Sequence, residues 1–428
     1  MDPITSVDVA IAQQRQIWRR ARANLRRSAP LRERLPTITE AQLELLRERS
    51  EAGDPIAEAV TPWALAMQLQ RRRWAEEEAR VRRWSTPQAG ELASPRDLRR
   101  TWLGARQSPR RVHAATIFPQ VAHELSMAEI DLANQRRDEG QSDPLPWVEG
   151  HTSDEILSLA SQVLRDTDDM ARELPEGPWH ERLRQALGVE ASEGWPARLS
   201  TSWLESVFAG TRLVDGLRIG GIALPALWGA SSFARALGRF GITVLEACRP
   251  KHVPLALHEH PRGTRRHAAH ALFASLIDDR IFAKVVLGLG SIRATEHQRL
   301  VARSSVQHLR IEATRTLLWH ALHHGPSNRD ALHEAFSATS ERALGTVLPT
   351  ALLAVTPTLD HAAGARLLGT LEAARWREAL ISSFDEDWYR NPQAIAEYRD
   401  RCSRVRSQDD APDAGLRLIV DRLSESLG

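Results

Sequence analysis

The fold of this chain is decided by residues 217–289, which read LRIGGIALPALWGASSFARALGRFGITVLEACRPKHVPLALHEHPRGTRRHAAHALFASLIDDRIFAKVVLGL. Within this stretch, apolar side chains recur at steps of three and four residues, at Phe233, Ala236, Leu237, Phe240 and Val244. Such spacing places them on one face of an amphipathic helix. We therefore expect a buried helix at the centre of the protein.

A second helix is expected to begin near Arg262, because Pro250 and Pro254 end the first one. Its apolar face would hold Leu272, Phe273, Leu276, residues 281–285 and Leu289. Five of the sixteen histidines of the chain lie on or between these two helices, at His252, His258, His260, His267 and His270. That density makes the region the strongest candidate for chemistry.

Helical patterns continue along most of the 428 residues, so the sequence predicts an all-α fold built as a multi-helix array. At most one short β-hairpin is expected, near residues 213–224, where two adjacent glycines occur. We expect a basic N-terminal helical unit over residues 1–90 and a larger helical body over residues 91–428. Residues 140–150, rich in Pro and Gly, are the place where that body would divide.

Particular side chains mark where helices begin. Thr39 with Gln42, and Thr152 with Glu155, have the spacing of a capping box, in which each side chain satisfies a backbone N–H of the other residue. A long helix is predicted over residues 294–324, where apolar side chains keep the helical period.

Charge is distributed unevenly along the chain. Residues 1–111 carry 22 Arg against 14 Asp and Glu, a net charge of +8, whereas the remainder has a net charge of −6. A basic surface favours an anionic partner, so we expect another protein with an acidic surface, bound through Arg71, Arg72 and Arg73. Nucleic acid is not expected, because no helix-turn-helix, zinc-finger or stacking motif accompanies the charge.

Cysteine usage and hydropathy suggest where the protein works. The two cysteines, Cys248 and Cys402, are too few for a disulfide framework and favour a reducing compartment. The N-terminus has no signal-peptide pattern, and no uncharged apolar run is long enough to span a membrane. We therefore expect a soluble, cytoplasmic protein without membrane contact.

A zinc site needs three or four converging ligands, frequently with two histidines one helical turn apart. His267 and His270 are three residues apart and share a helix face, while His258 and His260 would project alike from an extended segment. Glu312 is a further candidate ligand. These histidines are the candidate metal ligands, and zinc is the alternative to the expectation that no cofactor is bound.

The segment RHAAHALFASL, residues 266–276, resembles the active-site helix of thimet-type zinc metallopeptidases, largely helical proteins that carry His-Glu-x-x-His. In this chain the two histidines are one position closer together, and the glutamate is absent. The resemblance implies a peptidase-like helical scaffold for a metal-dependent hydrolase, with a non-standard or lost motif. Without that glutamate, the general base that would activate a zinc-bound water is missing.

A second motif lies at Asp166, Thr167, Asp168 and Asp169. It is similar to the Asp-x-Asp-Asp motif with which class II terpene cyclases protonate an alkene. That chemistry would need a carboxylic acid whose pKa burial has raised. The repeated Gln and Trp turns of the cyclases are not evident, and acids on an exposed helix are the favoured alternative.

The main evidence on function is that the sequence lacks the motifs of several common enzyme classes. The chain has no Walker pattern, no dinucleotide fingerprint and no nucleophile elbow. The sequence therefore favours a non-enzymatic helical protein that binds other proteins or acts as a scaffold. A metal-dependent hydrolase is the alternative, and a cyclase-like acid catalyst is the weaker one.

Overall fold

The structure of this chain is a computed structural model, and it describes residues 7, 9–11, 13, 38–72, 74–87, 93–104, 108–140, 150–174, 176–186, 188–191, 193–196, 200–213, 215, 229–250, 253–261, 263–325, 328–353, 362–404 and 412–428.

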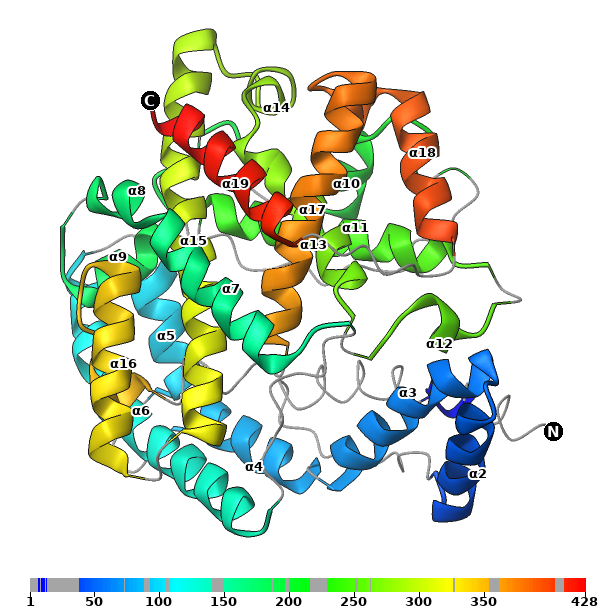
Figure 1. The fold of residues 1–428 in the computed structure, drawn as a ribbon. Helices are drawn as coiled ribbons and strands as arrows, with labels where there is room; N and C mark the ends of the chain where they lie inside the picture. The colour runs from blue at the N-terminus through cyan, green and yellow to red at the C-terminus, as the bar shows by residue number, and fades with distance from the viewer. Residues whose placement is uncertain are drawn as a thin grey trace.

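Every regular element within these ranges is helical, and none of the described residues forms a strand, which confirms the all-α prediction (Figure 1). The α-helices are α2 Glu40–Glu51, α3 Pro55–Arg72, α4 Trp74–Ser85, α5 Pro95–Gly104, α6 Ser108–Asp138, α7 Ser153–Asp166, α8 Asp168–Arg172, α9 Trp179–Gln185, α10 Thr201–Val207, α11 Ala230–Cys248, α12 Leu255–His258, α13 Arg265–Ala274, α14 Arg280–Val285, α15 Ser291–His324, α16 Arg329–Leu344, α17 Ala363–Phe384, α18 Pro392–Ser403 and α19 Pro412–Leu427. Short 3-10 helices η1 Ser275–Asp278, η2 Thr350–Leu352 and η3 Trp388–Arg390 connect some of them.

Helix α15 is the axis of the fold. It has 34 residues and runs through the middle of the molecule in Figure 1. Its N-terminal part packs against η1 and α14, and its C-terminal part against α7 and α16, while α17 and α19 also contact it. The predicted helix over residues 294–324 is thereby confirmed.

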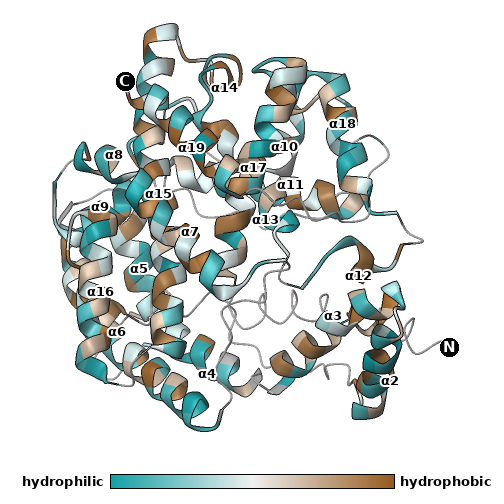
Figure 2. Cartoon of the chain, viewed as in Figure 1, coloured by the Kyte–Doolittle hydropathy of each residue, from teal (hydrophilic) through white to brown (hydrophobic). Residues whose placement is uncertain are grey.

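Three hydrophobic clusters form the core. One joins α5, α6, α7, α16 and α19 to the C-terminal part of α15, with Phe118, Leu309 and Phe336 among its buried side chains. A second joins α11, α13, η3 and α18 to the N-terminal part of α15, with Phe240 and Phe273 at its centre. A smaller third cluster joins α2 and α3 to α12. Figure 2 shows apolar residues along the sides of these helices that face their neighbours.

The predicted helix boundaries at two capping boxes are confirmed. Thr39 Oγ1 accepts a hydrogen bond from the Gln42 N–H at 3.2 Å, and Gln42 Oε1 accepts one from the Thr39 N–H at 2.9 Å. Thr152 and Glu155 make the same reciprocal pair before α7. Each box satisfies backbone donors that the first helical turn leaves open.

The helix expected from Arg262 through Leu289 is divided in the structure. It begins at Arg265, ends as α13 at Ala274, and resumes after η1 as α14. Asp279 causes the second start, because its Oδ1 accepts hydrogen bonds from the N–H groups of Ile281 at 2.7 Å and Phe282 at 3.0 Å.

Other expectations stay open. Most of the hairpin expected near residues 213–224 lies outside the described residues, as do residues 141–149 of the expected division. The proposed boundary between residues 1–90 and 91–428 stays a prediction. Among the helices whose placement is described, none is both long and apolar enough to cross a membrane.

Candidate functional site

A cluster of charged side chains surrounds Glu312 on α15. Glu312 is almost fully buried, with 6% of its side chain accessible. Its Oε1 lies 2.7 Å from Arg315 Nη1, one turn further along α15, and its Oε2 lies 2.9 Å from Arg366 Nε on α17. Both carboxylate oxygens are therefore bound by guanidinium groups, the strong charge-assisted form of hydrogen bond.

These ion pairs fix the protonation state of Glu312. Burial alone raises the pKa of a carboxyl group, but the positive charges of Arg315 and Arg366 outweigh it and lower the pKa of Glu312 to about 2. Glu312 is therefore an anion at any physiological pH. A carboxylate with so low a pKa is a weak general base at neutral pH.

Three histidines lie beside this glutamate. His308, one turn earlier on α15, has its Nε2 4.0 Å from Glu312 Oε1. His267 and His270 come from α13, and burial lowers the pKa of each to about 3, an effect that the nearby positive charges increase. Both imidazoles are consequently neutral at pH 7.

Helix α11 approaches α13 closely at His270. A Cβ atom at Gly238 would lie 2.5 Å from His270 Cδ2 and Nε2, which is closer than a real contact allows. A larger residue at position 238 would force the imidazole to move, so Gly238 gives His270 room to lie between the two helices.

Further arginines make the cluster strongly positive. Arg99 on α5 has its Cζ 6.0 Å from the centre of the Trp84 ring. The surrounding protein lowers the pKa of Arg99 to about 10, and the charges of Arg315 and Arg235 act in the same direction. The positive charges of Arg235 and Arg239 on α11 likewise lower the pKa of His270. Several positive charges that act on one another favour the binding of an anion.

The other two predicted histidines lie elsewhere. His258 is fully buried on α12, and its Nε2 is 2.6 Å from the backbone oxygen of Cys402. His260 follows in the turn after α12 and packs against Gly263. His267 and His270 are thus the two predicted ligands that the structure brings to the Glu312 cluster. In the part of the chain that the structure describes, no group of three or more His, Cys, Asp or Glu residues is arranged to hold a metal ion.

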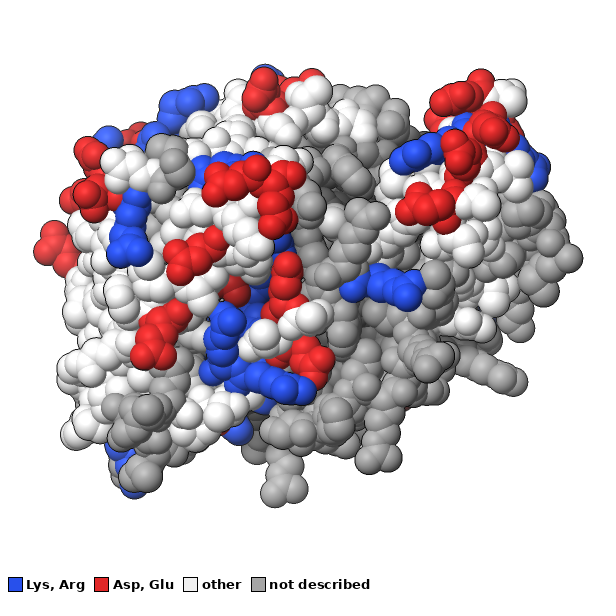
Figure 3. Space-filling view, turned by 90° about the horizontal axis from the view of Figure 1, so that it is seen from below, with Lys and Arg blue, Asp and Glu red and all other residues white. Residues whose placement is uncertain are grey.

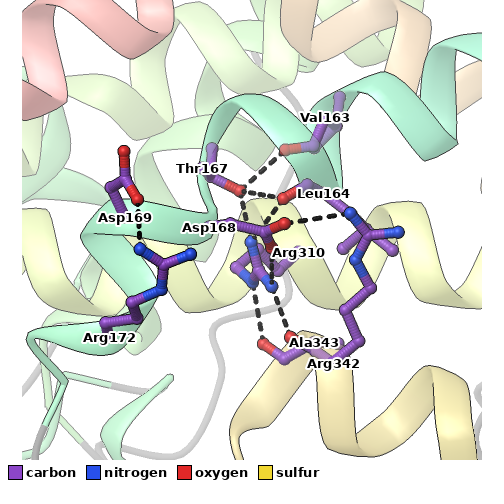
Figure 4. A network of polar contacts seen from close by, with 9 residues as sticks. All are labelled: Val163, Leu164, Thr167, Asp168, Asp169, Arg172, Arg310, Arg342 and Ala343. Atoms are coloured by element: carbon purple, nitrogen blue, oxygen red, sulfur yellow. Dashed lines mark hydrogen bonds and ion pairs between the residues drawn. The ribbon is translucent and has the colours of Figure 1, made fainter.

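The Asp-x-Asp-Asp motif belongs to a structural junction, shown in Figure 4. Buried Arg310 of α15 donates to Asp168 Oδ1 at 2.9 Å, Thr167 Oγ1 at 2.7 Å and the Leu164 oxygen at 2.8 Å. It also donates to the backbone oxygens of residues 342 and 343 on α16. One guanidinium group therefore joins α7, α8, α15 and α16.

These acids are not placed for proton donation. Burial raises the pKa of Asp168, but hydrogen bonds from Arg342 and Arg310 lower it below the ordinary value overall. Asp169 has 91% of its side chain accessible and pairs with Arg172, while Asp166 is exposed. The exposed-helix alternative fits Asp166 and Asp169, and Asp168 is an anion within an ion-pair network.

The predicted partner-binding residues lie at the end of α3. Arg71 is exposed, whereas the side chain of Arg72 and the whole of Arg73 lie outside what the structure describes. Figure 3 shows acidic and basic side chains interspersed over α2. Further basic side chains gather near the middle of the face in view. This face carries both signs of charge.

Sequence reasoning singled out His267, His270 and Glu312, but it missed Arg99, Arg315 and Arg366. Glu312 and Arg315 are three residues apart on one predicted helix, and this spacing could have predicted their ion pair. Arg366 is 54 residues from Glu312, and no local pattern connects the two.

Fold and site together define an all-α protein with an arginine-rich charge cluster around Glu312, where α17 packs against both α13 and α15. Among solved structures, the chain is similar to the carboxypeptidase of Pyrococcus furiosus in its apo-Mg form. The two share 10% sequence identity, the match covers 99% of each chain, and the TM-score is 0.51. This likeness concerns the fold. No family model matches the chain, and no curated protein matches it in sequence.

Proposed function

We propose that this chain is a non-enzymatic protein-interaction or scaffold protein with a carboxypeptidase-like helical fold. In this proposal it binds acidic groups of a partner polypeptide at the cluster around Glu312. The observation that carries the proposal is that Arg315 and Arg366 both bind the carboxylate of Glu312, and that the charge of Arg315 also acts on Arg99. Within the described ranges, Arg99 takes part in no ion pair of its own.

The chemistry of the cluster supports binding over catalysis. Glu312 is held on both oxygens and has a pKa of about 2, and the pKa of His267 and of His270 is about 3. None of these groups has the near-neutral pKa that suits a general base. The guanidinium group of arginine, by contrast, has paired N–H donors that match the two oxygens of a carboxylate.

A binding experiment tests this function directly. A fluorescein-labelled peptide of glutamates and a matched peptide of glutamines would be titrated with the protein at low and high salt. The glutamate peptide should bind more tightly, and salt should weaken it, because screening reduces charge attraction. Equal affinity for both peptides would contradict the proposal, and so would cleavage of either peptide, detected by mass spectrometry.

The second candidate is a metal-dependent hydrolase, and the carboxypeptidase neighbour is the observation that favours it. The neutral imidazoles of His267 and His270 suit metal coordination. The nearby carboxylate does not, because Arg315 and Arg366 already bind both of its oxygens. The described residues therefore do not fit a complete metal centre.

Metal analysis distinguishes the two candidates. Protein purified without a histidine tag would be analysed by mass spectrometry, beside a variant with His267→Ala and His270→Ala. One zinc per chain that disappears in the variant would support the hydrolase and a screen of peptide substrates. Equal metal content in both proteins would argue against these histidines as ligands.

A further inference from the structure

A pocket on the other side of α15 is separate from the Glu312 cluster. It has a volume of about 100 Å³ and is open to solvent. Its walls come from α9, from the turn at residues 188–190 and from the N-terminal half of α15. Leu174, Val189 and Leu300 supply apolar surface, and the remaining lining is mostly polar or charged.

Two glutamines give the pocket a polar wall. Gln307 is fully buried, and its Nε2 donates to Gln185 Oε1 at 3.0 Å. The Oε1 atom of Gln307 is buried and accepts no hydrogen bond from the described residues. The two amides therefore form the inner wall of the pocket, and the charged side chains stand nearer to the solvent.

Two opposite charges also belong to the lining. Arg303 of α15 and Glu190 of the turn are both exposed, and neither takes part in an ion pair within the described ranges. Glu181 and Arg184, by contrast, are paired, with 3.2 Å between Glu181 Oε2 and Arg184 Nε. One positive and one negative group outside these ion pairs thus line the same pocket, and the charge of Glu190 also acts on the neighbouring Arg184.

The turn that carries Glu190 is held in place. The Gly188 oxygen accepts hydrogen bonds from the N–H groups of Ala230 at 3.0 Å and Ala191 at 3.1 Å. Buried Ser304 donates to the Ala186 oxygen at 2.9 Å. Gly188 has φ +54°, and a Cβ there would lie 3.1 Å from Ala230 Cβ, so glycine is required. The pocket is preformed, which lowers the cost of ordering it around a ligand.

We propose that this pocket binds a small zwitterion of the free amino acid class. The ligand carboxylate pairs with Arg303, and its ammonium group pairs with Glu190. Leu174, Val189 and Leu300 contact the carbon atoms of the ligand. This site does not depend on the acidic-peptide function proposed above, because it shares no residue with the Glu312 cluster.

The test is a thermal-shift screen of the full-length protein with the standard amino acids, followed by calorimetry with the amino acid that gives the largest shift. At least one amino acid should raise Tm, because a ligand that binds only the folded state stabilises it. Acetate and methylamine, each carrying one of the two charges, should give weaker shifts. Arg303→Ala and Glu190→Gln should each reduce affinity about tenfold, the usual effect of losing one charge-assisted hydrogen bond.

Glu193→Gln is the matched control. Glu193 lies three residues beyond Glu190 and pairs with Arg293 at 2.7 Å, outside the pocket lining, so this variant should keep the wild-type affinity. Absence of any Tm shift across the screen would overturn the proposal. The same conclusion would follow if affinity were unchanged in both Arg303→Ala and Glu190→Gln. Either result leaves binding of the glutamate peptide, measured separately, as the test of the Glu312 cluster.

Discussion

Arg366 Nε on α17 donates a hydrogen bond of 2.9 Å to Glu312 Oε2 on α15, and this ion pair joins two core helices that lie far apart in the sequence. Arg315 binds the second oxygen of the same carboxylate. Glu312 therefore acts as an internal ligand of the cluster. A carboxylate from a partner would meet guanidinium groups that are already positioned to bind such a group.

Replacement of Glu312 by Gln should affect stability and binding in opposite directions. The variant leaves Arg315 and Arg366 without their counter-charge, and we expect a loss of about 2 kcal/mol in the free energy of unfolding, less than for a fully buried pair. It should also bind the glutamate peptide more tightly, because an internal competitor is removed. Urea denaturation and fluorescence anisotropy measure the two effects. Glu296→Gln, at an exposed position of α15, serves as the control.

A fall in stability without a gain in affinity for the glutamate peptide would show that the Glu312 ion pairs serve the fold alone.

Stability should fall as the pH is lowered below 6.5. Burial, followed by neighbouring positive charge, lowers the pKa of His267 and His270 from 6.5 to about 3, so between these values the unfolded chain takes up protons that the folded protein excludes. Below pH 4.5 Glu312 adds to the loss, because its pKa is lowered from 4.5 to about 2. Both contributions have the same sign: they are present at neutral pH and lost in acid.

The measurement is denaturant unfolding at a series of pH values from above 6.5 to 4.5. The double variant His267→Ala and His270→Ala should show a smaller dependence on pH than the wild-type protein, whereas His113→Ala, at an exposed position, should not. An unchanged dependence in the double variant would mean that these imidazoles take up protons in the folded state as readily as in the unfolded one.

Arg310→Lys should destabilise the protein by about 2–4 kcal/mol, because one ammonium group cannot replace the planar fork that binds α7, α8 and α16. Chemical denaturation gives the value. Arg172→Lys, on a side chain that is 78% accessible, is expected to change stability by less than about 0.5 kcal/mol. Equal effects of the two substitutions would mean that the junction in Figure 4 contributes little.

Charge reversal at Arg71, Arg72 and Arg73 tests whether the end of α3 is a second contact for an acidic partner. We expect weaker binding of the glutamate peptide and a shallower dependence on salt, since fewer charges would be neutralised. Arg47, which is exposed on α2, provides the control when its charge is reversed instead. Full retention of binding in the α3 variant would confine recognition to the Glu312 cluster.

Local sequence signals predicted much of the fold. The capping residues Thr39 and Thr152 marked helix starts correctly, because a cap is formed by residues three apart in the chain. The period of apolar residues predicted α11 and α15 for the same reason. The division of α13 from α14 was not predicted, since the apolar period continues across Asp279 and only its side-chain hydrogen bonds show the new start.

The candidate site was predictable only in part. His267 and His270 share a face of one helix, and their spacing indicated this. Arg99 and Arg366 reach the cluster from α5 and α17 through tertiary packing, which leaves no periodic trace in the sequence. His258 was also a predicted metal ligand because of its residue type. Its Nε2 instead lies within hydrogen-bond distance of the backbone oxygen of Cys402.

A comparison of Arg99→Ala with Arg100→Ala in glutamate-peptide binding tests whether the Glu312 cluster binds the acidic partner. The charge of Arg315 acts on Arg99, while its neighbour Arg100 is exposed on α5, so the two variants remove the same charge from adjacent positions. We predict that Arg99→Ala weakens binding about tenfold and that Arg100→Ala changes it less than about twofold. Equal affinities of the two variants would contradict the claim that the cluster around Glu312 binds the acidic partner.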